Sequence, residues 1–256
     1  MIAAARREIR PDIRWAIAFA WLLALAAELS GSSRLLHHDQ LIQGGLPRAA
    51  ALVLFLLAWQ AMIAAMMLPS SLPMIRLFGR TSAAQPHARL ARTIFISAYA
   101  LVWTAFGAAA FFFDIGIHAA VNQVPWLYSH AYLIGGGTLL LAAAFQFSPL
   151  KDACLRQCRN PGAFILRYYR RGLSAALLTG LRHGAFCLGC CWALMLVAFA
   201  AGAANLAWMA VLTLLMTLEK RSKIGPALVQ ASGAAMFLGG AFIVLRPLWR
   251  LLAIAV

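Results

Sequence analysis

Five cysteines are the residues of this chain best suited to chemistry. Cys187, Cys190 and Cys191 lie within five consecutive positions of an apolar stretch, GAFCLGCCWALM, and Cys154 and Cys158 precede them at helical spacing. Leu and Ala make a segment hydrophobic without the reactivity of a thiol, so this density predicts a thiol site or a soft-metal site. The cysteines are odd in number and clustered, which is not the pattern of a secreted disulfide framework.

Methionine and histidine residues extend this candidate site. Met62 and Met66 share one face of an expected helix at residues 49–68, and Met216 lies near the end of another at residues 204–218. Thiolate and thioether ligands suit Cu(I), whereas zinc prefers a set made from Cys and His. Copper is therefore the expected ion, with zinc as the alternative. The candidate metal ligands are Cys187, Cys190, Cys191, Met62, Met66, Met216, His183, Cys154 and Cys158.

The elements that must position these side chains are membrane helices. Hydrophobic residues make up 63% of the chain and charged residues only 11%, against about 25% charged in soluble domains. Repeated long apolar runs predict an all-α, polytopic transmembrane bundle of about seven spans, forming one integral membrane domain over residues 1–256. The expected spans cover residues 13–29, 49–68, 93–113, 130–147, 172–201, 204–218 and 227–245.

The basic residues orient this bundle. Twenty-two Lys and Arg against seven acidic residues give a net charge of +15, and most of them fall in alternate short loops. The positive-inside rule then places the N-terminus in the cytoplasm and the C-terminus outside. Ser148 and Pro149 predict the start of a short helix, 149–159, in a cytoplasmic basic loop at 148–171. Residues 161–181 form either part of a span or an interfacial helix.

This charge pattern also indicates the surroundings of the protein. Basic residues in the loops between apolar runs are typical of contact with anionic lipids, and we expect no nucleic-acid partner. The expected location is the bacterial cytoplasmic membrane. A membrane protein or a metal-carrier protein is expected as a further partner.

With this orientation, the soft ligands lie at a common depth. The Met62/Met66 face, the Cys187 region and Met216 all fall in the cytoplasmic halves of their helices. Gly180 and Gly184 continue the Cys187 stripe, and small residues at this spacing allow helices to approach closely in lipid. We therefore expect the cysteines on a buried packing face. Adjacent residues diverge by about 100°, so Cys190 should point to one side of that stripe.

Two further sets of polar residues carry weaker expectations. Glu219, at the end of the helix at 204–218, is expected to pair with Lys220 or Arg221 rather than to act as a base. Imidazole and carboxylate groups in the outward loops could hold Cu(II) or Zn(II). These residues are His37, His38, Asp39, Asp114, His118 and His130.

Several blocks of the chain together resemble a known family. The blocks are WQAMIAAMMLP from Trp59, SPLKDACLRQCRNP from Ser148, HGAFCLGCCWALM from His183, and NLAWM followed by LEK. In this order they resemble the predicted metal-binding integral membrane proteins, domain of unknown function 2182. The resemblance implies metal binding but no particular substrate or reaction. The family often has Met before the Asn of NLAWM, where this chain has Ala204.

Three functions fit the sequence. The first is a membrane protein that handles Cu(I) through a Cys/Met site for transfer, insertion or efflux. The second is a membrane thiol-disulfide oxidoreductase that cycles Cys187 with Cys190, and Cys154 with Cys158, by thiol exchange. The third is a non-catalytic subunit of a larger membrane complex. The chain lacks the GxSxG, phosphate-loop and HExxH motifs, which favours a binding or transfer role over an enzyme.

Overall fold

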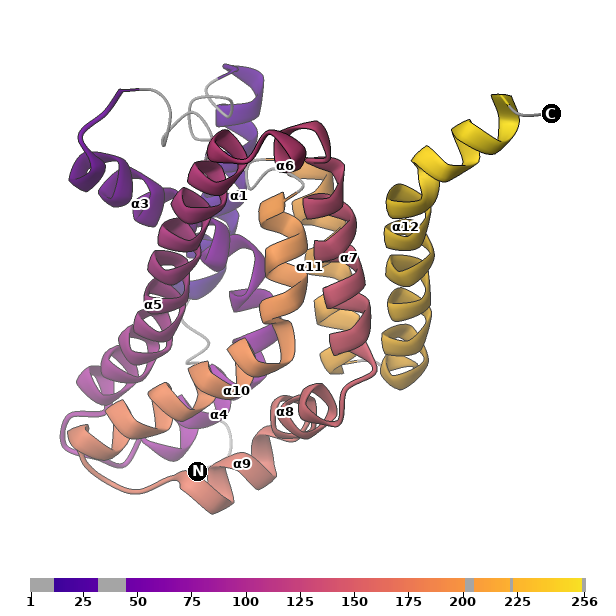
Figure 1. The fold of residues 1–256 in the computed structure, drawn as a ribbon. Helices are drawn as coiled ribbons and strands as arrows, with labels where there is room; N and C mark the ends of the chain where they lie inside the picture. The colour runs from indigo at the N-terminus through magenta and orange to yellow at the C-terminus, as the bar shows by residue number, and fades with distance from the viewer. Residues whose placement is uncertain (1–11, 32–44, 201–204, 222, 255–256) are drawn as a thin grey trace.

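The computed structural model describes residues 12–31, 45–200, 205–221 and 223–254, and this part of the chain is all-α, without strands. Figure 1 shows the helices as one bundle, with α8 and α9 across its lower end. The helices are α1 (Asp12–Leu29), α3 (Arg48–Met66), α4 (Leu68–Thr81), α5 (Ala88–Gln123), α6 (Pro125–Ser129), α7 (Tyr132–Gln146), α8 (Pro149–Arg159), α9 (Pro161–Tyr168), α10 (Leu173–Ala200), α11 (Leu206–Arg221) and α12 (Gly225–Ile254).

Four helices are long and apolar enough to cross a membrane. They are Arg48–Met66, Ala88–Gln123, Leu173–Ala200 and Gly225–Pro247. Helices α7 and α8 add a fifth if they form one path, which bends by 65° between them. The structure thus supports four or five of the seven expected spans in the described residues. The remaining spans and the orientation of the termini stay predictions.

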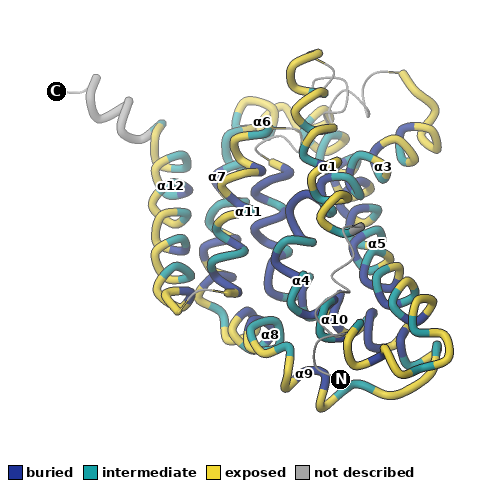
Figure 2. The backbone as a smooth tube through the Cα atoms, turned by 180° about the vertical axis from the view of Figure 1, so that it is seen from behind, coloured by how far each residue is buried: buried dark blue, intermediate teal, exposed yellow. Residues whose placement is uncertain are grey.

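Helix α10 is the centre of the bundle. Within its most apolar window 61% of the residues are buried, against 11% in α12, which lies at the edge beside α7 (Figure 2). Helix α5 packs along α10 at two glycines. A Cβ on Gly180 would lie 2.4 Å from the Phe95 carbonyl oxygen, and one on Gly184 would lie 2.9 Å from Val102. The predicted small-residue face is confirmed as the surface through which α10 contacts α5.

Glycines also join α7 to α12. The Gly136 carbonyl oxygen lies 3.0 Å from the position of a Cβ on Gly240, and a Cβ on Gly136 would lie 2.7 Å from Val244. These two glycines therefore serve contacts within the chain.

Two expected loops are helical instead. The chain after Met66 forms α4, with Pro69 in its first turn, where the missing N–H of proline is harmless. Helix α5 extends to Gln123, ten residues beyond the expected end at 113, so Asp114 and His118 lie on a helix. In α5 polar residues end the apolar run without ending the helix, whereas α3 ends at Met66 and a new helix starts at Leu68. The short helix at 149–159 is confirmed as α8.

Candidate metal centre

The predicted soft ligands from four helices meet in one buried cluster. Helices α3, α8, α10 and α11 supply it, and the half-buried Cys158 packs against it. The sequence placed these residues at one depth, and the structure shows that they also converge laterally. The buried members with sulfur are Met62, Met66, Met67, Cys154, Cys187, Cys190, Cys191, Met195, Met209 and Met216.

The sulfur of Cys190 lies close to thiols on two different helices. Its Sγ lies 3.4 Å from Cys191 Sγ on the same helix and 3.9 Å from Cys158 Sγ on α8. It also donates a hydrogen bond to the Cys187 carbonyl oxygen at 3.1 Å. Cys190 was expected to point to one side of the Cys187 stripe, and its sulfur lies between those of Cys191 on α10 and Cys158 on α8. All five thiols are free.

The start of α8 sets the position of its two cysteines. Ser148 caps the helix by accepting a hydrogen bond from the Lys151 N–H at 3.1 Å. One helical turn separates Cys154 from Cys158, so both reach α10 from the same face of α8. Gly189 makes room for this approach, because a Cβ there would lie 2.6 Å from Cys154 Sγ.

Cys187 has two polar neighbours that the sequence did not reveal. The hydroxyl of Tyr99 on α5 lies 3.3 Å from its Sγ, and the ammonium of Lys220 on α11 lies at the same distance. Tyr99 also accepts a hydrogen bond from Ser71, and Lys220 donates one to Ser70 at 3.1 Å. All five side chains are buried. This thiol is therefore enclosed by polar groups from α4, α5 and α11.

His183 lies one turn before Cys187 but faces aromatic rings. Its imidazole stacks on Tyr99 with a centroid separation of 5.2 Å and on Phe95 at 5.8 Å. Its side chain is buried, and neither ring nitrogen has a hydrogen-bond partner in the described part of the chain. A buried, unpartnered imidazole nitrogen is available to a metal ion.

Glu219 forms a buried ion pair with a distant residue. Its Oε2 accepts a hydrogen bond from Lys151 Nζ at 2.8 Å, and its Oε1 accepts one from Gln146 at 2.8 Å. Lys151 also bonds to Gln146, which bonds to Ser232 on α12. The expected pairing of Glu219 with Lys220 or Arg221 is wrong. Consecutive helical side chains point about 100° apart, so Lys220 turns toward Cys187 instead.

Arginines from α1, α4 and α11 lie near one another. Burial lowers the pKa of Arg76 on α4, and the nearby guanidinium groups of Arg14, Arg221 and Arg80 lower it further. The Nε of Arg76 is buried without a hydrogen-bond partner in the described residues. These four arginines therefore form one group of like charge.

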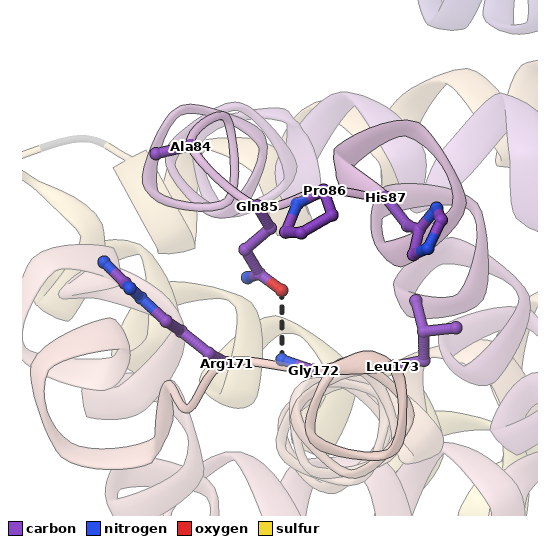
Figure 3. Close-up of a pocket in the computed structure, with 7 residues that line it drawn as sticks. All are labelled: Ala84, Gln85, Pro86, His87, Arg171, Gly172 and Leu173. Carbon is purple, nitrogen blue, oxygen red and sulfur yellow. Dashed lines mark hydrogen bonds between the residues drawn. The ribbon is translucent and has the colours of Figure 1, made fainter.

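A separate pocket of about 260 Å³ lies between the α4–α5 turn and the start of α10 (Figure 3). Gln85 crosses it to accept a hydrogen bond from the Gly172 N–H at 3.0 Å. Gly172 has φ +106°, which few other residues adopt. No sulfur ligand lines this pocket, so it is distinct from the thiol cluster. Its lining residues are Ala84, Gln85, Pro86, His87, Arg171, Gly172 and Leu173.

The structure describes three of the six residues of the expected outer His/Asp site. His37, His38 and Asp39 lie outside the described residues. Asp114 and His118 do come together on α5, with 3.5 Å between His118 Nδ1 and Asp114 Oδ1. His130 hydrogen-bonds to the Trp126 carbonyl oxygen.

In the described residues, no three His, Cys, Asp or Glu side chains are already arranged to hold a metal ion. The thiol cluster offers sulfur pairs and thioethers rather than a four-ligand cage. The fold and the cluster define an all-α bundle with cysteine and methionine side chains in its core. A family model described as PpoB2, copper chaperone, matches residues 56–243, and the chain belongs to this family. No curated protein and no solved structure matches the chain.

Proposed function

We propose that this protein is an integral membrane copper chaperone that holds Cu(I) on the clustered thiols of α8 and α10. The membership of the copper chaperone family supports the cargo. Four or five helices of sufficient length and apolarity support the membrane location. The same proposal includes a single membrane domain over residues 1–256 and a position of the cysteines in the cytoplasmic half of the bundle.

The observation that carries the proposal is the approach of thiols from two helices at Cys190. Two thiolates bound to one ion at about 2.3 Å each lie roughly 3.7 Å apart in a tetrahedral arrangement. The separations of Cys190 Sγ from Cys191 and Cys158 Sγ, 3.4 and 3.9 Å, lie on either side of that value. Small side-chain rotations would therefore suffice to place two sulfurs on one ion.

The composition of the cluster favours Cu(I) over Zn(II). Methionine thioethers contribute to it from α3 and α11, through Met62, Met66 and Met216. Thiolates bind both ions, but thioether ligands suit Cu(I), whereas zinc sites are made from Cys, His and carboxylate ligands. His183 is the imidazole nearest in sequence, and its ring packs against aromatic side chains. We propose Cys158, Cys187, Cys190 and Cys191 as the thiol ligands, with Cys154 and His183 as outer members.

Metal titration of the purified protein tests this proposal. The full chain in detergent, kept reduced, should bind Cu(I) in stoichiometric amount against a chromogenic Cu(I) chelator. Cys190→Ser should lose at least tenfold in Cu(I) affinity, because it removes the sulfur shared by both thiol pairs. Wild-type protein without stoichiometric Cu(I) would contradict the proposal.

Cys154→Ser is the matched control for this experiment. It removes a thiol from the same buried cluster, but the sulfur of Cys154 packs against Gly189. Its loss of affinity should be several-fold smaller than that of Cys190→Ser. Equal losses from both variants would show that general disruption of the cluster, rather than ligand removal, lowers the affinity.

One observation also favours a second function, thiol-disulfide exchange. The predicted pairs were Cys187 with Cys190 and Cys154 with Cys158, but the structure brings Cys158 on α8 close to Cys190 on α10. A disulfide between these two would link the helices. Mass spectrometry of protein equilibrated with reduced and oxidised glutathione checks this function. Cysteines that remain reduced at every ratio would count against it.

Anionic lipid is the partner that the charge distribution supports. Arg76 with Arg14, Arg80 and Arg221 forms one group of like charges, and Arg171 lines the separate pocket. Charged headgroups would relieve the repulsion within the arginine group. Co-sedimentation of the protein with anionic and neutral nanodiscs, at low and high salt, tests whether the headgroup charge matters. Equal retention of the protein on anionic and neutral nanodiscs would contradict a role for anionic lipid.

A further inference from the structure

Lys220 carries a positive charge into the thiol cluster. Its side chain is buried, and its ammonium lies 3.3 Å from Cys187 Sγ and 3.1 Å from Ser70 Oγ. Among the described residues no carboxylate pairs with it, because the neighbouring Glu219 is bound to Lys151. A buried ammonium needs an anion or strong acceptors beside it, and the sulfur of Cys187 is the one group in contact that can supply a full negative charge.

Ser70 fixes the position of this charge. The Ser70 hydroxyl donates a hydrogen bond to the Met67 carbonyl oxygen at 3.0 Å and accepts one from Lys220. Lys220 is thus held by α4 on one side and by α10 on the other. Its ammonium reaches the thiol cluster and is a fixed part of the charge environment of any ion bound there.

An ion on Cys187 would lie close to this ammonium. The sulfur is 3.3 Å from Lys220 Nζ, and a metal–sulfur bond of about 2.3 Å places the ion at most about 5.6 Å from the ammonium. The ammonium repels a divalent ion twice as strongly as a monovalent one. At an effective dielectric constant of about 20, the additional repulsion corresponds to about a hundredfold in relative affinity. This difference does not depend on how many thiolates bind the ion.

We infer that Lys220 sets the charge of the ion that the site accepts, favouring a monovalent soft cation over a divalent one. This inference rests on the proposed function, in which Cys187 binds metal. Lys220 is a specificity-determining residue that touches a ligand and not the ion itself. The cation class it selects is that of Cu(I), and the class it rejects includes Cd(II) and Zn(II).

The test compares two affinities in the same variants. Reduced, full-length protein in detergent is titrated with Cu(I) against a chromogenic Cu(I) chelator, and with Cd(II) against a divalent-ion chelator. Lys220→Met should raise the affinity for Cd(II) relative to that for Cu(I) by about a hundredfold. Lys220→Gln, which keeps a polar group next to Ser70, should change the ratio in the same direction and serves if the Met variant does not fold.

Arg221→Met is the matched control, since it removes one positive charge at the next position. Arg221 is exposed, so water and salt screen its charge, and the ratio should stay within about threefold of wild type. A Lys220 variant that weakens both ions by the same factor would overturn the inference and leave Lys220 with a structural role. A wild-type protein that binds neither ion would instead overturn the proposed function, and the inference with it.

Discussion

Two buried lysines at the same end of the bundle have opposite surroundings. Lys151 forms an ion pair with Glu219 and hydrogen-bonds to Gln146, so its charge is neutralised within the protein. Lys220 contacts a hydroxyl and a thiol, neither of which carries a permanent charge. The first arrangement is complete without a ligand. The second gains a counter-charge only when a sulfur is ionised, which is the form in which a thiol binds metal. Under the proposed function, the first environment stabilises the fold and the second belongs to the site that binds the ion.

The largest expected effect breaks the complete pair. Glu219→Gln leaves Lys151 buried without an anion, and we expect it to lower the free energy of unfolding by about 3–5 kcal/mol. Chemical denaturation in detergent, followed by circular dichroism, measures this change. The double variant Glu219→Gln/Lys151→Met should recover part of the loss, because it removes both charges. A single variant as stable as wild type would show that the ion pair contributes little.

The next effect should come from the cargo and act only through the thiol cluster. Free Cu(I) at one hundred times its dissociation constant should raise the free energy of unfolding of the wild type by about 2.7 kcal/mol. Cys190→Ser, with an affinity at least tenfold weaker, should lose about half of this increase or more, whereas Asp152→Asn on the exposed face of α8 should retain it. Thermal unfolding with and without Cu(I) provides the measurement. An equal increase in both variants would place the binding elsewhere.

Removing the second lysine should cost less than breaking the first pair. In metal-free, reduced protein, Lys220→Met should lower the free energy of unfolding by about 1 kcal/mol, the value of a lost hydrogen bond. The cost is small because the thiol of Cys187 can keep its proton and stay neutral. The variant therefore leaves no buried charge without a partner. Denaturation under the conditions used for Glu219→Gln provides the comparison. A loss as large as that of Glu219→Gln would mean that Lys220 is an equally essential structural charge.

The smallest effect sets the scale for an exposed pair. Asp152 and Arg156 form an ion pair one turn apart on α8, with 56% and 63% of their side chains exposed. Asp152→Asn should change the free energy of unfolding by only about 0.3–0.5 kcal/mol, and less in high salt. The same denaturation assay at two salt concentrations checks it. A cost above about 1 kcal/mol would show that α8 depends on its surface charges.

The sequence predicted the cysteine and methionine positions of the site better than its polar groups. Cys187, Met62 and Met216 were expected at one depth from helical periodicity and from the loop charges, and the structure places them in one cluster. Ser148 and Pro149 gave the start of α8 correctly because capping is a local interaction. Residues that repeat with the helical period are thus visible before the fold is known.

The pairing of charges was not visible in the same way. Lys151 and Glu219 are 68 positions apart, and Lys220 and Cys187 are 33 apart, so neither contact follows from periodicity on one helix. The sequence still contained an indication that such contacts exist, because these ionisable residues lie directly beside apolar runs. What was missing is the rotation of each helix against its neighbours. That rotation depends on close approaches such as Gly180 against Phe95, which only three-dimensional packing defines.

The consecutive positions of Glu219 and Lys220 have a mechanical consequence for α11. A helix held by one polar contact can still turn about its own axis, with that contact as the pivot. Here two contacts leave the helix about 100° apart and reach α8 and α10 separately, so any turn of α11 stretches one of them. The C-terminal end of α11 is thereby fixed both in its rotation about the helix axis and in its position along that axis. Helix α8 is held to the same point at both of its ends, by Lys151 and by Arg159, whose Nε donates a hydrogen bond to the Glu219 carbonyl oxygen at 2.8 Å. A change of shape on loading or unloading would then fall to the cysteine side chains rather than to the helices.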